Sequence, residues 1–221
     1  MSSVESPTPP PPQPEKRSRW RVGAAAIVGL VALLYIVELV DQLSDQRLDR
    51  NGIRPLEADG LWGIVFAPLL HAGWGHLVAN TGPALVLGFL VTLTGLSRFV
   101  WATAIVWVVG GFGTWLIGNV GSSCGETDHI GASGLIFGWL AFLLVFGFFV
   151  RSAWQILTGI VVLLAYGGLL WGAIPVLGMC GGVSWQGHLC GAVAGVLAAY
   201  LLSGPEREAR EQRRSQRAVA A

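Results

Sequence analysis

A serine lies among small residues at the start of a long apolar run. Ser133 follows Gly131 and Ala132 and precedes Gly134, and the apolar run continues to Val150. A serine hydroxyl becomes a nucleophile when a base, usually a neutral histidine, takes its proton. The flanking glycines would let the backbone of a substrate come close to it. Ser133 therefore fits a catalytic nucleophile, and a small residue used only for helix packing is the alternative interpretation.

His188 is the candidate base for this serine. Small residues spaced four apart let two helix backbones approach closely. Such glycines surround His188 and follow Ser133, at Gly187, Gly191 and Gly195 and at Gly134 and Gly138. We expect the two helices to pack glycine against glycine, with Ser133 and His188 within hydrogen-bonding reach.

Attack by a serine creates an oxyanion, which needs hydrogen-bond donors. The backbone N–H of Ser133 at a helix start is one candidate donor. The segment HLVAN supplies His76 and Asn80, which are four residues apart and therefore share one helical face. His71 precedes them in LLHAGWGH. The residue types predict Ser133 and His188 as a catalytic pair, with His76 and Asn80 as oxyanion donors.

The composition places these residues in a membrane. Hydrophobic residues make up 53% of 221 positions, charged residues only 12%, and the mean hydropathy is +0.60. Soluble domains carry about 25% charged residues. Asp, Glu, Lys and Arg are absent from four long stretches, 60–97, 99–125, 130–150 and 152–205. Since a span needs roughly 20 apolar residues, we predict six helices near 22–40, 75–95, 99–118, 132–150, 153–172 and 185–203.

Charge at the helix ends predicts the orientation. An even number of spans puts both termini on one side of the membrane. That side receives eleven basic residues: Lys16, Arg17, Arg19, Arg21, Arg98, Arg151, Arg207, Arg210, Arg213, Arg214 and Arg217. The other side receives three: Arg47, Arg50 and Arg54. The positive-inside rule predicts cytoplasmic termini and an active site that opens to the extracytoplasmic face.

The three motifs together resemble those of a known family. HAGWGHLVAN, GASG and GHLCGAVAG, in this order, are similar to the motifs of the rhomboid intramembrane serine proteases. The resemblance implies an all-α bundle of six membrane helices and a Ser133–His188 dyad. It also implies an oxyanion site of His76, Asn80 and the Ser133 amide, and a structural role for His71 within its own loop. Residues 21–203 would form this domain, between a disordered Pro-rich and basic tail (1–20) and a charged tail (204–221).

Two positions differ from well-known members of the family. The residue four after the serine is Phe137 instead of Tyr, so packing on His188 is retained but a hydroxyl is lost. The Trp-Arg pair of the first external loop corresponds here to Trp62 and Gly63. Neither change touches the predicted catalytic set.

Further expectations concern the loops and the fifth helix. Cys124 and Cys180 both fall in loops on the active-site side, where an oxidising compartment would allow a disulfide. The fifth helix, near 155–171, contains Gly159, Gly167 and Gly168. We expect it to pack loosely and to act as a gate for substrate.

Other membrane chemistries fit the sequence less well. HExxH is absent and no span interior contains Asp, so zinc and aspartyl intramembrane proteases are disfavoured. We expect no cofactor, no metal site and no nucleic-acid partner. The expected partners are the lipid bilayer and the transmembrane segments of substrate proteins, and the oligomeric state stays open. The alternatives are an inactive relative that binds membrane helices and a transporter that uses the His–Asn cluster.

Overall fold

The protein is a bundle of membrane-length helices. The computed structural model describes residues 16–123, 127–178 and 182–219, which contain no strand but include an isolated β-bridge between Ile53 and His129. Six helices are long and apolar enough to cross a membrane: Trp20–Leu43, Trp74–Leu93, Leu96–Ile117, Ser133–Val150, Ala153–Ala173 and Trp185–Leu202. The all-α, six-span prediction is confirmed, and the helix ends agree within a few residues.

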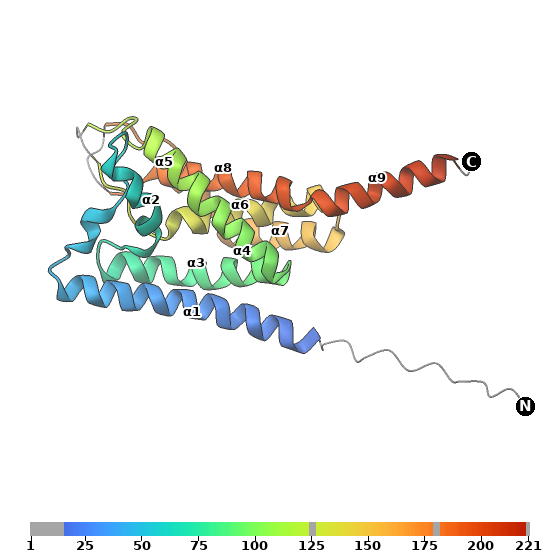
Figure 1. Cartoon of the computed structure of the whole chain (residues 1–221), viewed down its shortest axis with the longest axis horizontal. Helices are drawn as coiled ribbons and strands as arrows, with labels where there is room; N and C mark the ends of the chain where they lie inside the picture. The colour runs from blue at the N-terminus through green and yellow to red at the C-terminus, as the bar shows by residue number, and fades with distance from the viewer. Residues whose placement is uncertain (1–15, 124–126, 179–181, 220–221) are drawn as a thin grey trace, which may run out of the picture.

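The spans follow one another antiparallel, so that α1 begins and α8 ends on the same side of the bundle (Figure 1). The first two spans are formed by α1 (Lys16–Leu43) and α3 (Trp74–Leu93). The third contains α4 (Leu96–Ile105), a π-helical turn η4 (Val106–Gly110) and α5 (Gly111–Ile117). The fourth is α6 (Ser133–Val150), the fifth α7 (Ala153–Tyr166) with the 3₁₀ segment η5 (Gly167–Ala173), and the sixth α8 (Trp185–Leu202).

Short helices fill the long connection between α1 and α3. These are η1 (Leu48–Asn51), η2 (Asp59–Trp62), α2 (Gly63–Phe66) and η3 (Ala67–Leu69). Trp62 is 71% exposed and Phe66 44% exposed. Such large apolar side chains on a short helix are typical of contact with a membrane interface.

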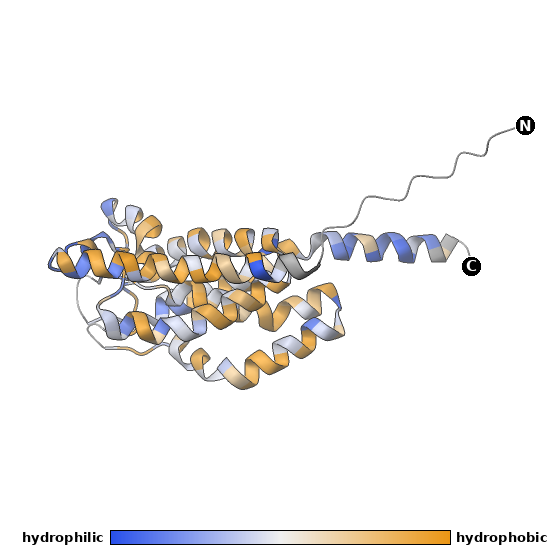
Figure 2. Ribbon diagram, turned by 90° about the horizontal axis from the view of Figure 1, so that it is seen from below, coloured by the Kyte–Doolittle hydropathy of each residue, from blue (hydrophilic) through white to orange (hydrophobic). Residues whose placement is uncertain are grey.

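The central helix is α6. Most of its side chains are buried, and its core residues include Trp139, Leu140, Phe142, Leu143 and Phe146. Many large apolar side chains of the outer helices are exposed. Hydrophobic residues occupy most of the length of the bundle (Figure 2). A surface of this kind has lipid as its natural solvent.

Backbone contact between α6 and α8 organises the bundle, as the glycine spacing predicts. A Cβ placed on Gly191 would lie 2.2 Å from the carbonyl oxygen of Gly134. One placed on Gly195 would lie 2.0 Å from the carbonyl oxygen of Gly138. No side chain fits at either position of α8, and the first turns of α6 and α8 are therefore held side by side.

The fifth span is the least buried of the six, which agrees with the expected loose packing. Only 11% of its most apolar 18-residue stretch is buried, compared with 61% for α6. Gly159 does not contribute to this looseness, contrary to the expectation from sequence. A Cβ there would lie 3.0 Å from the Leu143 carbonyl oxygen, so Gly159 allows α7 to approach α6 closely. The loose part is the η5 half, where Gly168 has open space around it.

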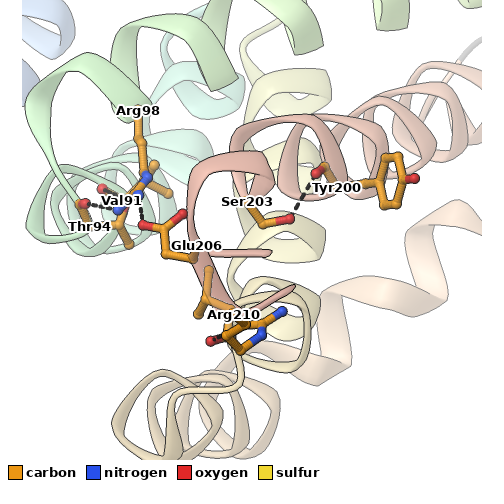
Figure 3. Close-up of polar contacts among 8 residues, drawn as sticks. Val91, Thr94, Arg98, Tyr200, Ser203, Glu206 and Arg210 are labelled. Atoms are coloured by element: carbon orange, nitrogen blue, oxygen red, sulfur yellow. Dashed lines mark hydrogen bonds and ion pairs between the residues drawn. The ribbon is translucent and has the colours of Figure 1, made fainter. Parts of the chain in front are cut away.

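The charged C-terminal segment is helical and contacts the end of the bundle where α4 begins and α6 ends. In α9 (Gly204–Val219), Glu206 pairs with Arg98 of α4, and Arg98 also donates to the Thr94 carbonyl oxygen at 2.9 Å (Figure 3). Arg210 donates to the carbonyl oxygens of Phe149 and Val150 at 2.8 and 2.6 Å. These carbonyl oxygens belong to the last turn of α6 and accept no hydrogen bond from an N–H of the helix. The α9 helix thus caps α6.

Two of the three cysteines, Cys124 and Cys180, lie outside the described residues, so their disulfide remains a prediction. Cys190 is a free thiol within α8, where it packs against Gly113 of α5.

The α6–α8 contact can be tested by adding one methyl group. Gly195→Ala should lower the free energy of unfolding by roughly 1–3 kcal/mol, because its Cβ meets a carbonyl oxygen that cannot yield. Gly29→Ala in α1 is the matched control, since nothing lies within 4 Å of its Cβ. Thermal unfolding in detergent measures both. Equal melting temperatures for the two variants would contradict the close packing.

Candidate active site

Ser133 is the first residue of α6 and is presented by a glycine turn. Gly131 has φ +119°, and its N–H donates to the Ala67 carbonyl oxygen at 2.8 Å. A Cβ on Gly131 would lie 2.7 Å from Cε1 of His76, so glycine is required both by the backbone and by the neighbouring ring. Within the described residues, the Ser133 hydroxyl has no hydrogen-bond partner. It lines a cavity of about 750 Å³.

His188 is buried in the first turn of α8, and its ring is held on two sides. Its Nδ1 lies 2.9 Å from the Gly172 carbonyl oxygen, and its ring stacks on Phe137 at 4.0 Å between centroids. A carbonyl oxygen only accepts, so Nδ1 carries the proton and Nε2 is left as an acceptor. This is the state that a general base requires. The expected packing of Phe137 on His188 is confirmed.

His76 and Asn80 lie one turn apart on α3. His76 Nδ1 accepts from the Ala72 N–H at 3.4 Å, which leaves Nε2 as the protonated nitrogen of the neutral ring. Asn80 is buried, and its Nδ2 has no partner in the described structure. Unpaired buried donors are costly, and both side chains line the cavity that Ser133 lines. They are free to donate to a group that enters it.

The four predicted side chains therefore meet at one cavity, although they come from three helices. Ser133, His188, His76 and Asn80 all line it, together with Phe137 and Gly172. The structure departs from the expectation in one respect: no hydrogen bond joins Ser133 to His188 within the described chain. In proteins without a bound substrate, catalytic hydrogen bonds are often long and tighten only in the complex.

His71 supports the site from behind, and its contacts extend beyond its own loop. Its Nε2 accepts from the Ala132 N–H at 3.4 Å, so it connects the approach to α3 with the start of α6. Its ring meets that of His76 edge-on at 5.1 Å. Burial, with the nearby His76, lowers the pKa of His71 to about 4. A neutral ring that accepts from Ala132 is consistent with this pKa.

One residue that lines the cavity was missed by the sequence analysis. His129 is buried, and its ring lies between Thr127 and Ser184. It belongs to no motif, and the one hint in the sequence is its place four residues before Ser133. Burial lowers its pKa to about 4.

The site holds the parts of a serine hydrolase. A free hydroxyl lies at a helix N-terminus, a neutral histidine has an available nitrogen, and further donors face the same space. Among the described residues, no three His, Cys, Asp or Glu side chains are grouped as metal ligands.

Comparison with known proteins gives the family. The profile of the Rhomboid domain matches residues 58–205, which is more than half of the chain. This chain belongs to the rhomboid family. A protein of Acanthamoeba polyphaga mimivirus that is named a rhomboid protein is 26% identical over 136 residues, covering 62% of this chain and 72% of its own.

Much closer relatives of this rhomboid occur in mycobacteria. A Mycobacterium tuberculosis H37Rv protein is 75% identical over 200 residues, covering 90% of this chain and 83% of its own. A Mycobacterium leprae protein is 69% identical over 195 residues, covering 88% and 77%. Both are named as uncharacterized, so they add no function. The rhomboid match makes this a multi-pass membrane protein of an intramembrane protease family.

The depressed pKa of His71 predicts acid sensitivity. The unfolded chain protonates this histidine below about pH 6.5, whereas the native protein does so only near 4. Its contribution to stability is therefore complete above about pH 6.5 and is lost as the pH falls towards 4. Melting temperatures in detergent should fall across this window, and they should fall less in His71→Asn.

Asp49 acts in the opposite direction and serves as the control. Burial, with Asp41 and Glu38 nearby, raises its pKa to about 6. Its protonated native form therefore adds stability as the pH falls below 6, and Asp49→Asn should steepen the acid loss relative to the wild type. The same pH slope in the wild type and His71→Asn would show that His71 is not buried as a neutral ring.

Proposed function

We propose that this rhomboid is a serine endopeptidase that cleaves transmembrane segments of other membrane proteins with a Ser133–His188 dyad. The observation that carries the proposal is the cavity of about 750 Å³ among six membrane spans, lined at once by the serine, the histidine and two candidate oxyanion donors.

The first half of the reaction forms an acyl-enzyme. His188 Nε2 takes the Ser133 hydroxyl proton as Oγ attacks the carbonyl carbon of the scissile peptide. The carbonyl oxygen becomes an oxyanion that accepts from the Ser133 N–H, the His76 Nε2–H and the Asn80 amide. The C–N bond then breaks, and the leaving amine receives the proton from His188.

Water completes the cycle. It attacks the ester carbonyl while His188 Nε2 takes its proton, and the second oxyanion uses the same donors. Collapse releases the new carboxyl end and returns the proton to Ser133. The Gly172 carbonyl oxygen, which accepts from His188 Nδ1, orients the ring, so no carboxylate third member is needed.

The substrate would be a helix that unwinds locally. Carbonyls in a regular helix are hydrogen-bonded and shielded, so small residues that destabilise a helix should favour cleavage. One cavity wall is α3 at Ala79 and Pro83, and another is η5 at Gly168 and Leu169. Because η5 is loosely packed, we place access for the substrate between these two walls.

The membrane orientation follows from charge. The basic residues at the α9 end of the bundle favour the cytoplasmic side. The site end, with η1 and the short helices before α3, would then face away from the cytoplasm. Water could reach Ser133 from that side.

The dyad is tested by cleavage of a transmembrane reporter and by a fluorophosphonate probe. Ser133→Ala and His188→Ala should each abolish cleavage, and the probe should label Ser133 in the wild type but much less in His188→Ala. Ser203→Ala, at the far end of α8, is the matched control and should cleave normally. Equal cleavage by the wild type and Ser133→Ala would favour a transporter or an inactive helix-binding relative.

The oxyanion role of Asn80 predicts a partial loss. Asn80→Ala removes an amide that has no partner in the described structure, so its effect should fall on the transition state. We expect kcat to fall by up to about two orders of magnitude with little change in KM. Thr81→Ala is the neighbouring control, since Thr81 bonds Leu77 and Tyr35 away from the cavity. A rise in KM at constant kcat in Asn80→Ala would reject the oxyanion role.

A further inference from the structure

His129 is attached to the Ser133 segment by its backbone. Its N–H and carbonyl oxygen both pair with Ile53, at 3.0 Å each, in an isolated antiparallel β-bridge. Three residues, Ile130, Gly131 and Ala132, separate it from Ser133. The bridge therefore fixes the segment that delivers the candidate nucleophile.

The side chain of His129 reaches the start of α8. Its Nδ1 lies 2.6 Å from the Ser184 hydroxyl, and Ser184 is the N-cap of α8, accepting from the Gly187 N–H at 3.0 Å. The carbonyl oxygen of the same Ser184 accepts from the His188 N–H at 3.1 Å. Two hydrogen bonds thus lead from the His129 ring to the backbone of His188.

The hydrogen bonds around His129 have one consistent direction. Thr127 Oγ1 donates to Asn119 Oδ1 at 2.7 Å, so it accepts from His129 Nε2 at 2.9 Å. Nε2 therefore carries the proton, and Nδ1 is left to accept from the Ser184 hydroxyl. The Ser184 oxygen keeps a lone pair for the Gly187 N–H. Every member of this network is satisfied when His129 is neutral.

We propose that His129 is a positioning residue that holds the His188-bearing start of α8 against the segment that delivers Ser133. The proposal rests on the proposed function of the dyad. No local bond joins Ser133 to His188, so their separation depends on what holds the two helix starts. The glycine contact fixes the helix axes, and the His129–Ser184 bond fixes the first turn of α8. The low pKa of His129, caused by burial, keeps the ring neutral in the pH range where a histidine base works.

A double-mutant cycle tests the proposal. His129→Phe keeps the ring volume but removes both hydrogen bonds, and Ser184→Ala removes the partner hydroxyl. His129→Phe should lower kcat on a transmembrane reporter about tenfold with KM nearly unchanged, because only the lost bond to Ser184, and not the one to Thr127, leads to His188. In the Ser184→Ala background, His129→Phe should lower kcat by less than about twofold, because both substitutions remove the hydrogen bond between His129 and Ser184. His129→Asn, which retains an acceptor near the Nδ1 position, should recover part of the loss.

Nuclear magnetic resonance of ¹⁵N-histidine protein provides a readout that needs no activity. In the Ser133→Ala background, His129 should show the Nε2-protonated tautomer. The ring signals of His188 should shift in His129→Phe but not in Ser203→Ala, the control at the other end of α8.

The outcomes separate this proposal from the function on which it rests. A kcat within twofold of the wild type in His129→Phe, or single effects that multiply in the double variant, would overturn the positioning role while leaving the protease intact. A wild type that cleaves nothing would overturn the proposed function, and the His188 signals would then decide the positioning role alone. If His129→Phe does not fold, His129→Asn and Ser184→Ala give the same comparison.

Discussion

The site depends on the backbone contact between α6 and α8. Lipid tails are as apolar as the side chains that face them, so helices in a membrane associate through close packing and polar contacts rather than through hydrophobic burial. Gly191 lies against the Gly134 carbonyl and Gly195 against the Gly138 carbonyl, at separations that exclude any side chain on α8. This contact aligns the first turns of the two helices. Ser133 begins one of them, and His188 lies in the first turn of the other.

The polar groups near this contact fall into two sets with opposite properties. The supporting side chains each have a partner: His71 Nε2 with Ala132, His129 with Ser184 and Thr127, and His188 Nδ1 with Gly172, although Nδ1 of His71 has none in the described structure. The groups facing the cavity are unpaired within the described structure, namely the Ser133 hydroxyl and the Asn80 amide. A buried unpaired donor reduces stability. The buried Nδ2 of Asn80 carries this cost, and under the proposed function it would donate to an oxyanion.

The sequence predicted the six spans, and the two helices that carry Ser133 and His188, because the signals for these elements are local. Charge-free stretches predict membrane helices, and glycines four apart predict which two helices touch. The π-helical turn at Val106–Gly110 has no such signal, since a single wide turn leaves the apolar pattern unchanged. His129 was missed because its partner Ser184 is 55 positions away in the chain. Gly159 was misinterpreted because a glycine that loosens a helix and one that admits a neighbour look alike in sequence. The contact of His71 with Ala132 was missed because the two residues are 61 positions apart in the chain.

The packing around α6 is uneven: the α8 side is held closely, whereas the η5 side, next to the cavity, is not. On the α8 side, backbones touch and the His129 network fastens the helix start. On the α7 side, Gly159 holds the half near the α6–α7 turn, whereas η5 beside the cavity has few buried side chains. The Gly172 carbonyl, which orients His188, lies on this looser segment. A displacement of η5 large enough to admit a helix would therefore also disturb the hydrogen bond that orients the base. Phe137, which stacks on His188 from the rigid α6, would keep the ring near its place while η5 moves, so access and catalytic alignment need not exclude each other.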